Sequence, residues 1–208
     1  MNKTLQGRTI AILSTDGFEQ SELLEPRKAL LAAGAKVDVV SPKDGSIKGW
    51  DEKDWGENVN VDVSLSSAHA EDYDAVVLPG GVMNPDSLRI NTEALTFLKS
   101  FHDAGKPIAA ICHGPQSLIE IGAVKGRTMT SYSSLRTDLQ NAGATWIDQE
   151  VVEDNGLVTS RTPKDIPAFN KKMIEVFANG PVKDQGRSRP SSPSPSMSGD
   201  ADAATAHA

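Results

Sequence analysis

A short apolar run that ends on a cysteine constrains this fold more than any other feature. Residues 107–116 read Pro-Ile-Ala-Ala-Ile-Cys-His-Gly-Pro-Gln, and Cys112 is the only cysteine among 208 residues. The apolar run is typical of a buried parallel strand, and Pro115 lies where the first turn of a helix tolerates proline. The chain must therefore turn sharply at Cys112, between a strand and a helix.

This turn predicts a nucleophile elbow, the tight strand-to-helix bend that pushes a reactive side chain out of the backbone. The pattern Ala110-x-Cys112-x-Gly114 stands in place of Gly-x-Ser-x-Gly, with small residues on both sides of the bend. Free N–H groups at a helix N-terminus favour a thiolate over a thiol. The alternative is a structural cysteine in the protein interior, a common environment for this residue.

Strand and helix patterns alternate along the chain, which predicts an α/β fold with a mostly parallel sheet. Strands are expected at 9–13, 36–40, 75–78 and 107–111, and helices at 21–33, 92–104, 116–121 and 163–178. Pro26 lies inside the first helical span, so the regular helix is expected to begin only there. Residues 43–57 indicate a small hairpin, and Asn155-Gly156 predicts a two-residue type I′ turn in a second hairpin over 151–158.

The length fits one α/β domain, which we assign to residues 1–180. Residues 181–208 are rich in Ser, Pro and Ala with almost no bulky apolar side chain, so we expect a disordered tail. The tail has three basic and three acidic residues, so the net charge of −7 belongs to the folded part. This charge argues against nucleic acid as the main partner.

A single cysteine excludes an internal disulfide and is consistent with a reducing compartment. The N-terminal residues lack the pattern of a secretion signal, and no apolar run approaches the roughly 20 residues that a membrane helix needs. We therefore expect a cytoplasmic protein without a membrane partner. The scattered histidines and the missing glycine-rich phosphate loop predict no bound metal and no cofactor.

Candidate partners for the sulfur follow other predicted strands. His113 is adjacent to Cys112, and its alternative role is to cap the following helix. Glu19 follows the first strand, at the sheet edge where open α/β proteins place their sites. It is a candidate for a protonated carboxyl group that donates a hydrogen bond to the sulfur. Its alternative role is a first-turn glutamate favoured by the helix dipole.

Two further positions lie near the same edge. Gly80 and Gly81 follow the strand at 75–78, and glycine allows backbone N–H groups to approach a ligand closely, as an oxyanion hole requires. An ordinary turn would explain the pair equally well. Asp86 is either a helix cap or a catalytic acid.

Four sequence blocks together resemble the ThiJ/PfpI family, within the class I glutamine amidotransferase-like superfamily. The resemblance covers residues 9–177 and is closest to the PfpI branch of intracellular peptidase-like and stress proteins. It implies a three-layer α/β/α sandwich with a flavodoxin-like sheet. The matching blocks are Asp-Gly-Phe-Glu-Gln-Ser-Glu-Leu at 16–23, Tyr-Asp-Ala-Val-Val-Leu-Pro-Gly-Gly at 73–81, Ala-Ile-Cys-His-Gly-Pro at 110–115 and Thr-Ser-Tyr at 130–132.

The resemblance also implies roles for individual residues. Cys112 would be the nucleophile, His113 its base and Glu19 the carboxyl group beside the sulfur. The backbone N–H groups of Gly81 and His113 would form the oxyanion hole, and Tyr132 would line the site.

The same resemblance implies that a neighbouring subunit supplies the acid of the triad, and therefore a homodimer or a higher homo-oligomer. The matching position is Asp86, where the family often has glutamate. A glutamine amidotransferase of this fold needs a histidine far downstream of its cysteine. Residues 115–180 contain none, which excludes that activity.

Three functions remain open on sequence alone. The resemblance favours a cysteine-dependent, stress-protective hydrolase that acts on methylglyoxal or on early glycation adducts of proteins and nucleotides, a deglycase or glyoxalase type of enzyme. An intracellular cysteine peptidase would use the same residues on an amide carbonyl. A non-catalytic oxidative-stress sensor or chaperone would use Cys112 without turnover, because an accessible thiolate oxidises readily.

Overall fold

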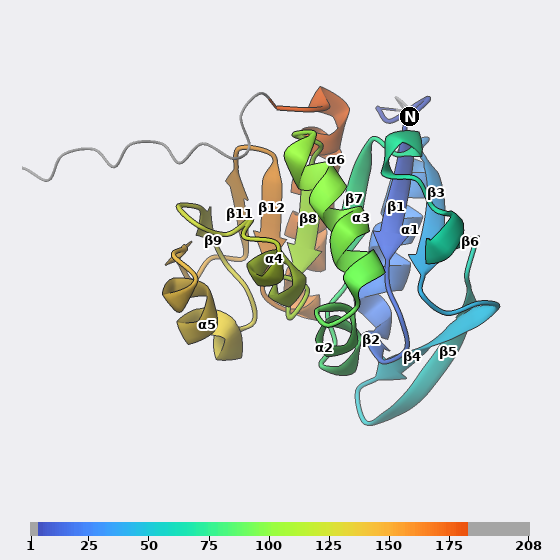
Figure 1. The fold of residues 1–208 in the computed structure, drawn as a ribbon, viewed down its shortest axis with the longest axis horizontal. Coiled ribbons are helices and arrows are strands. Elements are labelled where there is room, and N and C mark those ends of the chain that lie inside the picture. Colours follow the sequence, from blue (N-terminus) through green and yellow to red (C-terminus); the bar gives the residue numbers. More distant parts are fainter. Residues whose placement is uncertain (1–3, 183–208) are drawn as a thin grey trace, which may run out of the picture.

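A seven-stranded sheet forms the centre of the protein, in the order β11-β12-β8-β7-β1-β3-β6 (Figure 1). Residues 4–182 are described, by a computed structural model. All neighbours in this sheet are parallel except β11, which pairs antiparallel with β12. The strands are β1 (Thr9–Leu13), β3 (Lys36–Ser41), β6 (Val63–Ser64), β7 (Ala75–Leu78), β8 (Ile108–Ile111), β11 (Val151–Asp154) and β12 (Leu157–Ser160).

Helices cover both faces of this sheet, and the α/β sandwich predicted from the sequence is confirmed (Figure 1). Alternate residues of β1 enter opposite cores, as the two-residue period of a strand requires. Ile10 and Ile12 pack with α1 (Gln20–Ala32) and α6 (Ile166–Asn179), whereas Ala11 and Leu13 pack with α3 (Thr92–Asp103) and α4 (Gln116–Glu120). Strands buried on both faces explain the continuous apolar runs in the sequence.

The first helix begins earlier than expected. Helix α1 runs unbroken from Gln20, with Pro26 buried in its interior. An interior proline costs about 3 kcal/mol because it removes a hydrogen bond and crowds the preceding turn. Leu23 and Leu30 on the same face are fully buried, and their burial stabilises the helix against this cost.

Both predicted hairpins are confirmed. Strands β4 (Ser46–Asp51) and β5 (Asp54–Asn60) are antiparallel, and β2 (Phe18–Glu19) pairs with β4 to form a separate three-stranded sheet. At the turn between β11 and β12, Asn155 and Gly156 have φ angles of 48° and 83°. Positive φ at both central residues is what a type I′ turn requires.

The remaining elements are short. They are α2 (Met83–Leu88), α5 (Arg136–Asn141), β9 (Thr128–Met129) and β10 (Thr145–Trp146). Within residues 4–182, no helix has the length and apolarity needed to cross a membrane. The predicted tail at 181–208 lies outside the described residues from 183 onward.

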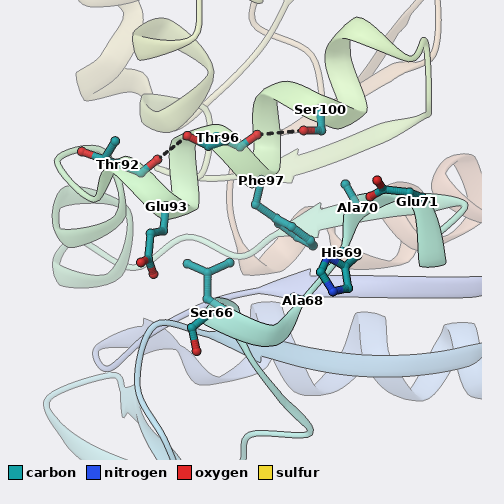
Figure 2. Close-up of a pocket in the computed structure, with 11 residues that line it drawn as sticks. Ser66, Ala68, His69, Ala70, Glu71, Thr92, Glu93, Thr96, Phe97 and Ser100 are labelled. Atoms are coloured by element: carbon teal, nitrogen blue, oxygen red, sulfur yellow. Dashed lines mark hydrogen bonds between the residues drawn. The ribbon is translucent and has the colours of Figure 1, made fainter.

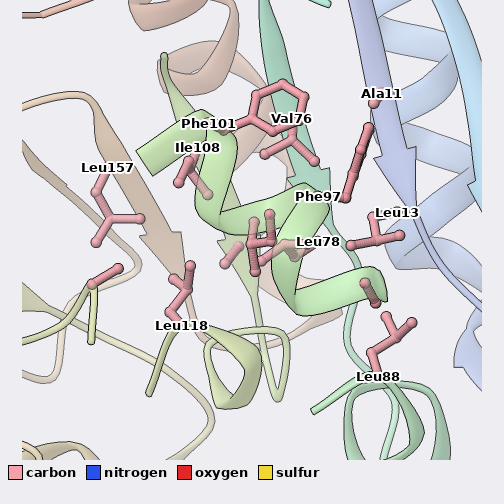
Figure 3. Packing of buried hydrophobic residues seen from close by; sticks show 14 of the residues in the cluster. Ala11, Leu13, Val76, Leu78, Leu88, Phe97, Phe101, Ile108, Leu118 and Leu157 are labelled. Atoms are coloured by element: carbon pink, nitrogen blue, oxygen red, sulfur yellow. The ribbon is translucent and has the colours of Figure 1, made fainter. Parts of the chain in front are cut away.

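One apolar cluster between α3 and the sheet provides a test of the packing (Figure 3). Phe101 is fully buried there, and its ring meets Phe97 edge to face with 5.1 Å between centroids. We expect Phe101→Ala to lower the free energy of unfolding by about 3–5 kcal/mol, through lost burial and the cavity left behind. Urea denaturation measures this change. Leu31→Ala, at a half-exposed position of α1, is the control and should change it by less than about 0.5 kcal/mol.

Candidate active site

Cys112 occupies a strained bend at the end of β8. Its φ angle is +60°, in the left-handed region that non-glycine residues rarely adopt. Hydrogen bonds fix the backbone on both sides of the bend: the Cys112 N–H donates to the Ser160 carbonyl (3.0 Å), and the Cys112 carbonyl accepts from the Tyr132 N–H (2.9 Å). This is the strand-to-helix elbow expected from the sequence.

The surroundings of the sulfur are polar although Cys112 is only 7% exposed. The sulfur lies 3.2 Å from His113 Nδ1. The backbone N–H groups of Gly81 and His113 and the Glu22 side chain lie next to the sulfur and act on its pKa. A cysteine that only filled the interior would not collect an imidazole, a carboxyl group and two free N–H donors.

The carboxyl group beside the sulfur belongs to Glu22, and the expectation that Glu19 takes this place is wrong. Glu22 is fully buried, and its Oε2 accepts a hydrogen bond from the Gly80 N–H at 2.9 Å. Its other oxygen, Oε1, has no hydrogen-bond partner. Burial raises the pKa of Glu22 to about 8, so the carboxyl group is protonated at neutral pH.

Glu19 lies elsewhere because of where the chain turns. It belongs to β2, which pairs with β4, and its Oε1 accepts a hydrogen bond from the Ser21 hydroxyl. Burial raises the pKa of Glu19 too, and the charges of Asp51 and Glu52 add to this effect. Glu22 lies almost one helical turn further along, where α1 passes the sulfur.

A sequence signal for Glu22 did exist. The buried stripe of α1 contains Glu22, Leu23, Pro26 and Leu30, so one carboxylate shares the core-facing side of the helix. Glutamate is almost never fully buried unless it has a partner. An acidic residue on an apolar stripe was therefore a better candidate than Glu19, which lies before the helix.

The resting sulfur is a thiol, contrary to the expectation from the helix N-terminus. Burial raises the pKa of Cys112, and the Glu22 carboxyl group raises it further once that group ionises. Helix α4 has only five residues and begins at Gln116, so its dipole does not offset this effect. Burial also lowers the pKa of His113. The pair is therefore a neutral thiol next to a neutral imidazole, which can take the proton when the sulfur attacks.

The backbone that follows β7 lies close to Cys112 because two glycines occupy it. A Cβ on Gly80 would lie 2.5 Å from Glu22 Oε2 and 2.7 Å from Cys112 Cβ, so no larger residue fits. Gly81 has a φ angle of +80°, and a Cβ there would lie 2.4 Å from the Gly17 carbonyl oxygen. This close approach packs the glycine loop after β7 against the turn after β1.

Asn84 holds this glycine loop, and sequence reasoning missed it. Its buried amide nitrogen donates to the carbonyls of Pro79 (3.0 Å) and Gly80 (3.1 Å). Its Oδ1 accepts from the Thr15 N–H (2.8 Å) and the Ser14 hydroxyl (3.3 Å). One side chain thus connects the carboxyl ends of β1 and β7.

The other side of His113 faces a loop that precedes α5. Its Nε2 lies 3.1 Å from the Ser134 hydroxyl, and its ring stacks on Tyr132 with 4.8 Å between centroids. Tyr132, predicted to line the site, is 40% exposed. Asp86 lies on the exposed face of α2 and makes no contact with His113 within the described chain. Ser134 carried no recognisable signal in the sequence.

A cavity of about 310 Å³ opens beside Tyr132, and Trp146, Arg161 and Lys164 are among the residues that line it. Another cavity, of about 370 Å³, lies between α3 and the segment 65–71 (Figure 2). The hydroxyls of Thr96 and Ser100 there donate to carbonyls of their own helix. Across residues 4–182, no group of three His, Cys, Asp or Glu side chains is arranged to hold a metal ion.

Comparison with known proteins finds a family and individual relatives that match most of the chain. Residues 8–176 match the DJ-1/PfpI family. The chain is 45% identical over 173 residues to general stress protein 18 of Bacillus subtilis, covering 82% of this chain and 98% of that protein. It is 42% identical over 172 residues to protein/nucleic acid deglycase 2 of Escherichia coli, covering 82% and 98%. The crystal structure of DJ-1beta from Drosophila melanogaster is 30% identical with a TM-score of 0.75, covering 86% and 92%.

The effect of Glu22 on the pKa of the Cys112 thiol can be tested. We expect Glu22→Gln to lower the pKa of Cys112, because the substitution removes the negative charge that forms next to the sulfur above pH 8. The rate of iodoacetamide alkylation as a function of pH measures this pKa. Glu19→Gln is the matched control and should shift the profile less. A larger shift in Glu19→Gln would contradict the assignment of Glu22.

Proposed function

Because this chain belongs to the DJ-1/PfpI family, we propose that it is a stress-protective hydrolase that uses Cys112 to act on methylglyoxal or on glycation adducts. The observation that carries this proposal is a sulfur on a left-handed bend, 3.2 Å from an imidazole nitrogen. The name of the Escherichia coli relative supports deglycation as the reaction. The cytoplasm, where thiols stay reduced, is the proposed location.

The proposed reaction with methylglyoxal starts with attack of the sulfur on the aldehyde carbon. The thiol proton moves to His113 Nδ1 as the S–C bond forms, and the N–H groups of Gly81 and His113 stabilise the oxyanion. Proton return from His113 gives a hemithioacetal. The proton on the sulfur-bearing carbon then moves to the neighbouring carbon, and the hydroxyl proton moves to the former ketone oxygen. This isomerisation gives a lactoyl thioester, which water hydrolyses to lactate and the free thiol.

Two groups beside the sulfur are suited to move these protons. A general acid or base works best when its pKa lies near the operating pH. The pKa of Glu22 is about 8, and the neutral imidazole of His113 is the second group. Both lie against Cys112, so neither needs a conformational change to act.

A peptidase is the second candidate, with the same nucleophile and base. Amide cleavage needs an extended groove for the peptide and a proton for a poor leaving group. The cavity beside Tyr132 is about 310 Å³, near the lower end of the usual range for small-molecule sites. Neither Cys112 nor His113 lines this cavity, so its size does not decide between a peptide and a small carbonyl compound. A redox sensor or chaperone is the third candidate, and it would need no turnover.

One set of assays distinguishes the three candidate functions. We expect wild-type protein to release lactate from methylglyoxal, and Cys112→Ala to lose this activity by roughly a thousandfold or more. His69→Ala, at an exposed histidine of the other cavity, should retain it. Cleavage of a fluorogenic peptide without lactate release would favour the peptidase. If Cys112→Ala kept both activities, this would contradict Cys112 as the nucleophile.

We also propose a homodimer or higher homo-oligomer in which Asp86 of a second chain approaches His113. Light scattering of the full chain measures the oligomeric state. If Asp86 acts across subunits, Asp86→Asn and Cys112→Ala should each be inactive alone. A mixed oligomer of the two should regain activity, because some sites then combine an intact Cys112 with an intact Asp86. Full activity of Asp86→Asn would contradict this arrangement.

A further inference from the structure

We propose that Ser134 is a positioning residue of the site, whose hydroxyl accepts a hydrogen bond from His113 Nε2 and so presents Nδ1 to the Cys112 thiol. This inference rests on the proposed function, because it concerns the base of the same reaction. It places the orienting group of His113 within the same chain, independently of any second subunit.

The two ring nitrogens of His113 have separate partners. Nδ1 lies 3.2 Å from the Cys112 sulfur, and Nε2 lies 3.1 Å from the Ser134 hydroxyl. A neutral imidazole has one proton, so one nitrogen donates and the other accepts. The nitrogen facing the thiol must be the acceptor if His113 is to take the thiol proton, and the proton must then be on Nε2.

Ser134 suits this role because a hydroxyl oxygen accepts hydrogen bonds from both forms of the ring. It accepts from Nε2–H in the neutral imidazole, and it still accepts after Nδ1 has gained the thiol proton. The hydrogen bond therefore persists through the proton transfer. A serine hydroxyl can also donate to an unprotonated Nε2, so the Ser134 bond fixes the orientation of the ring, and the thiol, as a donor to Nδ1, sets the tautomer together with it.

The segment around Ser134 is held by a hydrogen bond to the elbow and by contacts with the core and with Trp146. The Tyr132 N–H donates to the Cys112 carbonyl at 2.9 Å, and the Leu135 N–H donates to the Tyr132 carbonyl at 3.0 Å. Leu135 is buried in the core, and the Trp146 indole N–H donates to the Ser131 hydroxyl at 3.0 Å. These contacts hold the loop in position before a substrate arrives.

Ring stacking removes most of the remaining freedom of His113. Its plane is 25° from that of Tyr132. Stacking restricts the plane of the imidazole but does not decide which edge faces the sulfur. The hydrogen bond to Ser134 does so, because turning the ring over would leave the Ser134 hydroxyl facing carbon.

The test compares Ser134→Ala with Ser134→Thr, which keeps the hydroxyl and adds a methyl group at an exposed position. Ser133→Ala is the matched control, since Ser133 is the adjacent exposed serine and its hydroxyl makes no hydrogen bond to another described side chain. Nitrogen-15 NMR of the His113 ring in the full chain reports which nitrogen is protonated. The release of lactate from methylglyoxal gives kcat and KM.

We expect the wild-type ring to be protonated mainly on Nε2 and Ser134→Ala to populate both tautomers. In Ser134→Ala, kcat should fall by about five- to tenfold, the effect of one neutral hydrogen bond, with little change in KM. Ser134→Thr should retain the wild-type tautomer and most of kcat. Ser133→Ala should match wild type in both measurements.

Several results would overturn the proposal. One is an unchanged tautomer in Ser134→Ala. Another is a decrease in kcat in Ser134→Thr as large as the decrease in Ser134→Ala. A third is a tautomer shift in Asp86→Asn with none in Ser134→Ala, which would mean that a second chain orients the ring. If the wild type releases no lactate, the proposed function fails, and the NMR measurement still decides the role of Ser134.

Discussion

The two main-chain hydrogen bonds at Cys112 are the constraint on which the rest of the site depends. A non-glycine residue in the left-handed region costs roughly 1–3 kcal/mol, so such a conformation persists only when the surroundings enforce it. Here Ser160 at the end of β12 holds the Cys112 N–H, and the Tyr132 N–H holds its carbonyl. With the backbone fixed, the sulfur faces the Gly81 and His113 N–H groups and the imidazole together.

A second constraint on the site is that two of its polar side chains, Glu22 and Asn84, are fully buried. Glu22 reaches the sulfur from α1, and Asn84 ties the ends of β1 and β7 together with four hydrogen bonds. A buried polar group without a hydrogen-bond partner lowers the stability of the fold. Each of these hydrogen bonds therefore stabilises the fold and also fixes the distance between the two groups that it joins. The resulting site is neutral at rest, with its protons on the thiol, on Glu22 and on one nitrogen of His113.

Local features of the sequence predicted the fold and part of the site. The apolar run before Cys112, the alternation of strands and helices, and the Asn155–Gly156 turn depend on neighbouring residues, and each was confirmed. Glu22 was missed because the choice between two carboxylates depends on the phase of α1, which is set by its start at Gln20. Ser134 was missed because its partner His113 is distant in sequence, and Asn84 because Ser14 and Thr15 are. No periodicity reports a contact between residues 113 and 134.

The register of β12 has a consequence for the opposite end of the sheet. Ser160 pairs with Ile111, and the tight turn at Asn155–Gly156 sets the alignment of β12 with β11. Because side chains alternate along a strand, a slip by one residue would invert every side chain of β12 and change the carbonyl offered to Cys112. The length of this edge hairpin therefore bears on the position of the nucleophile, although its turn lies at the other end of β12.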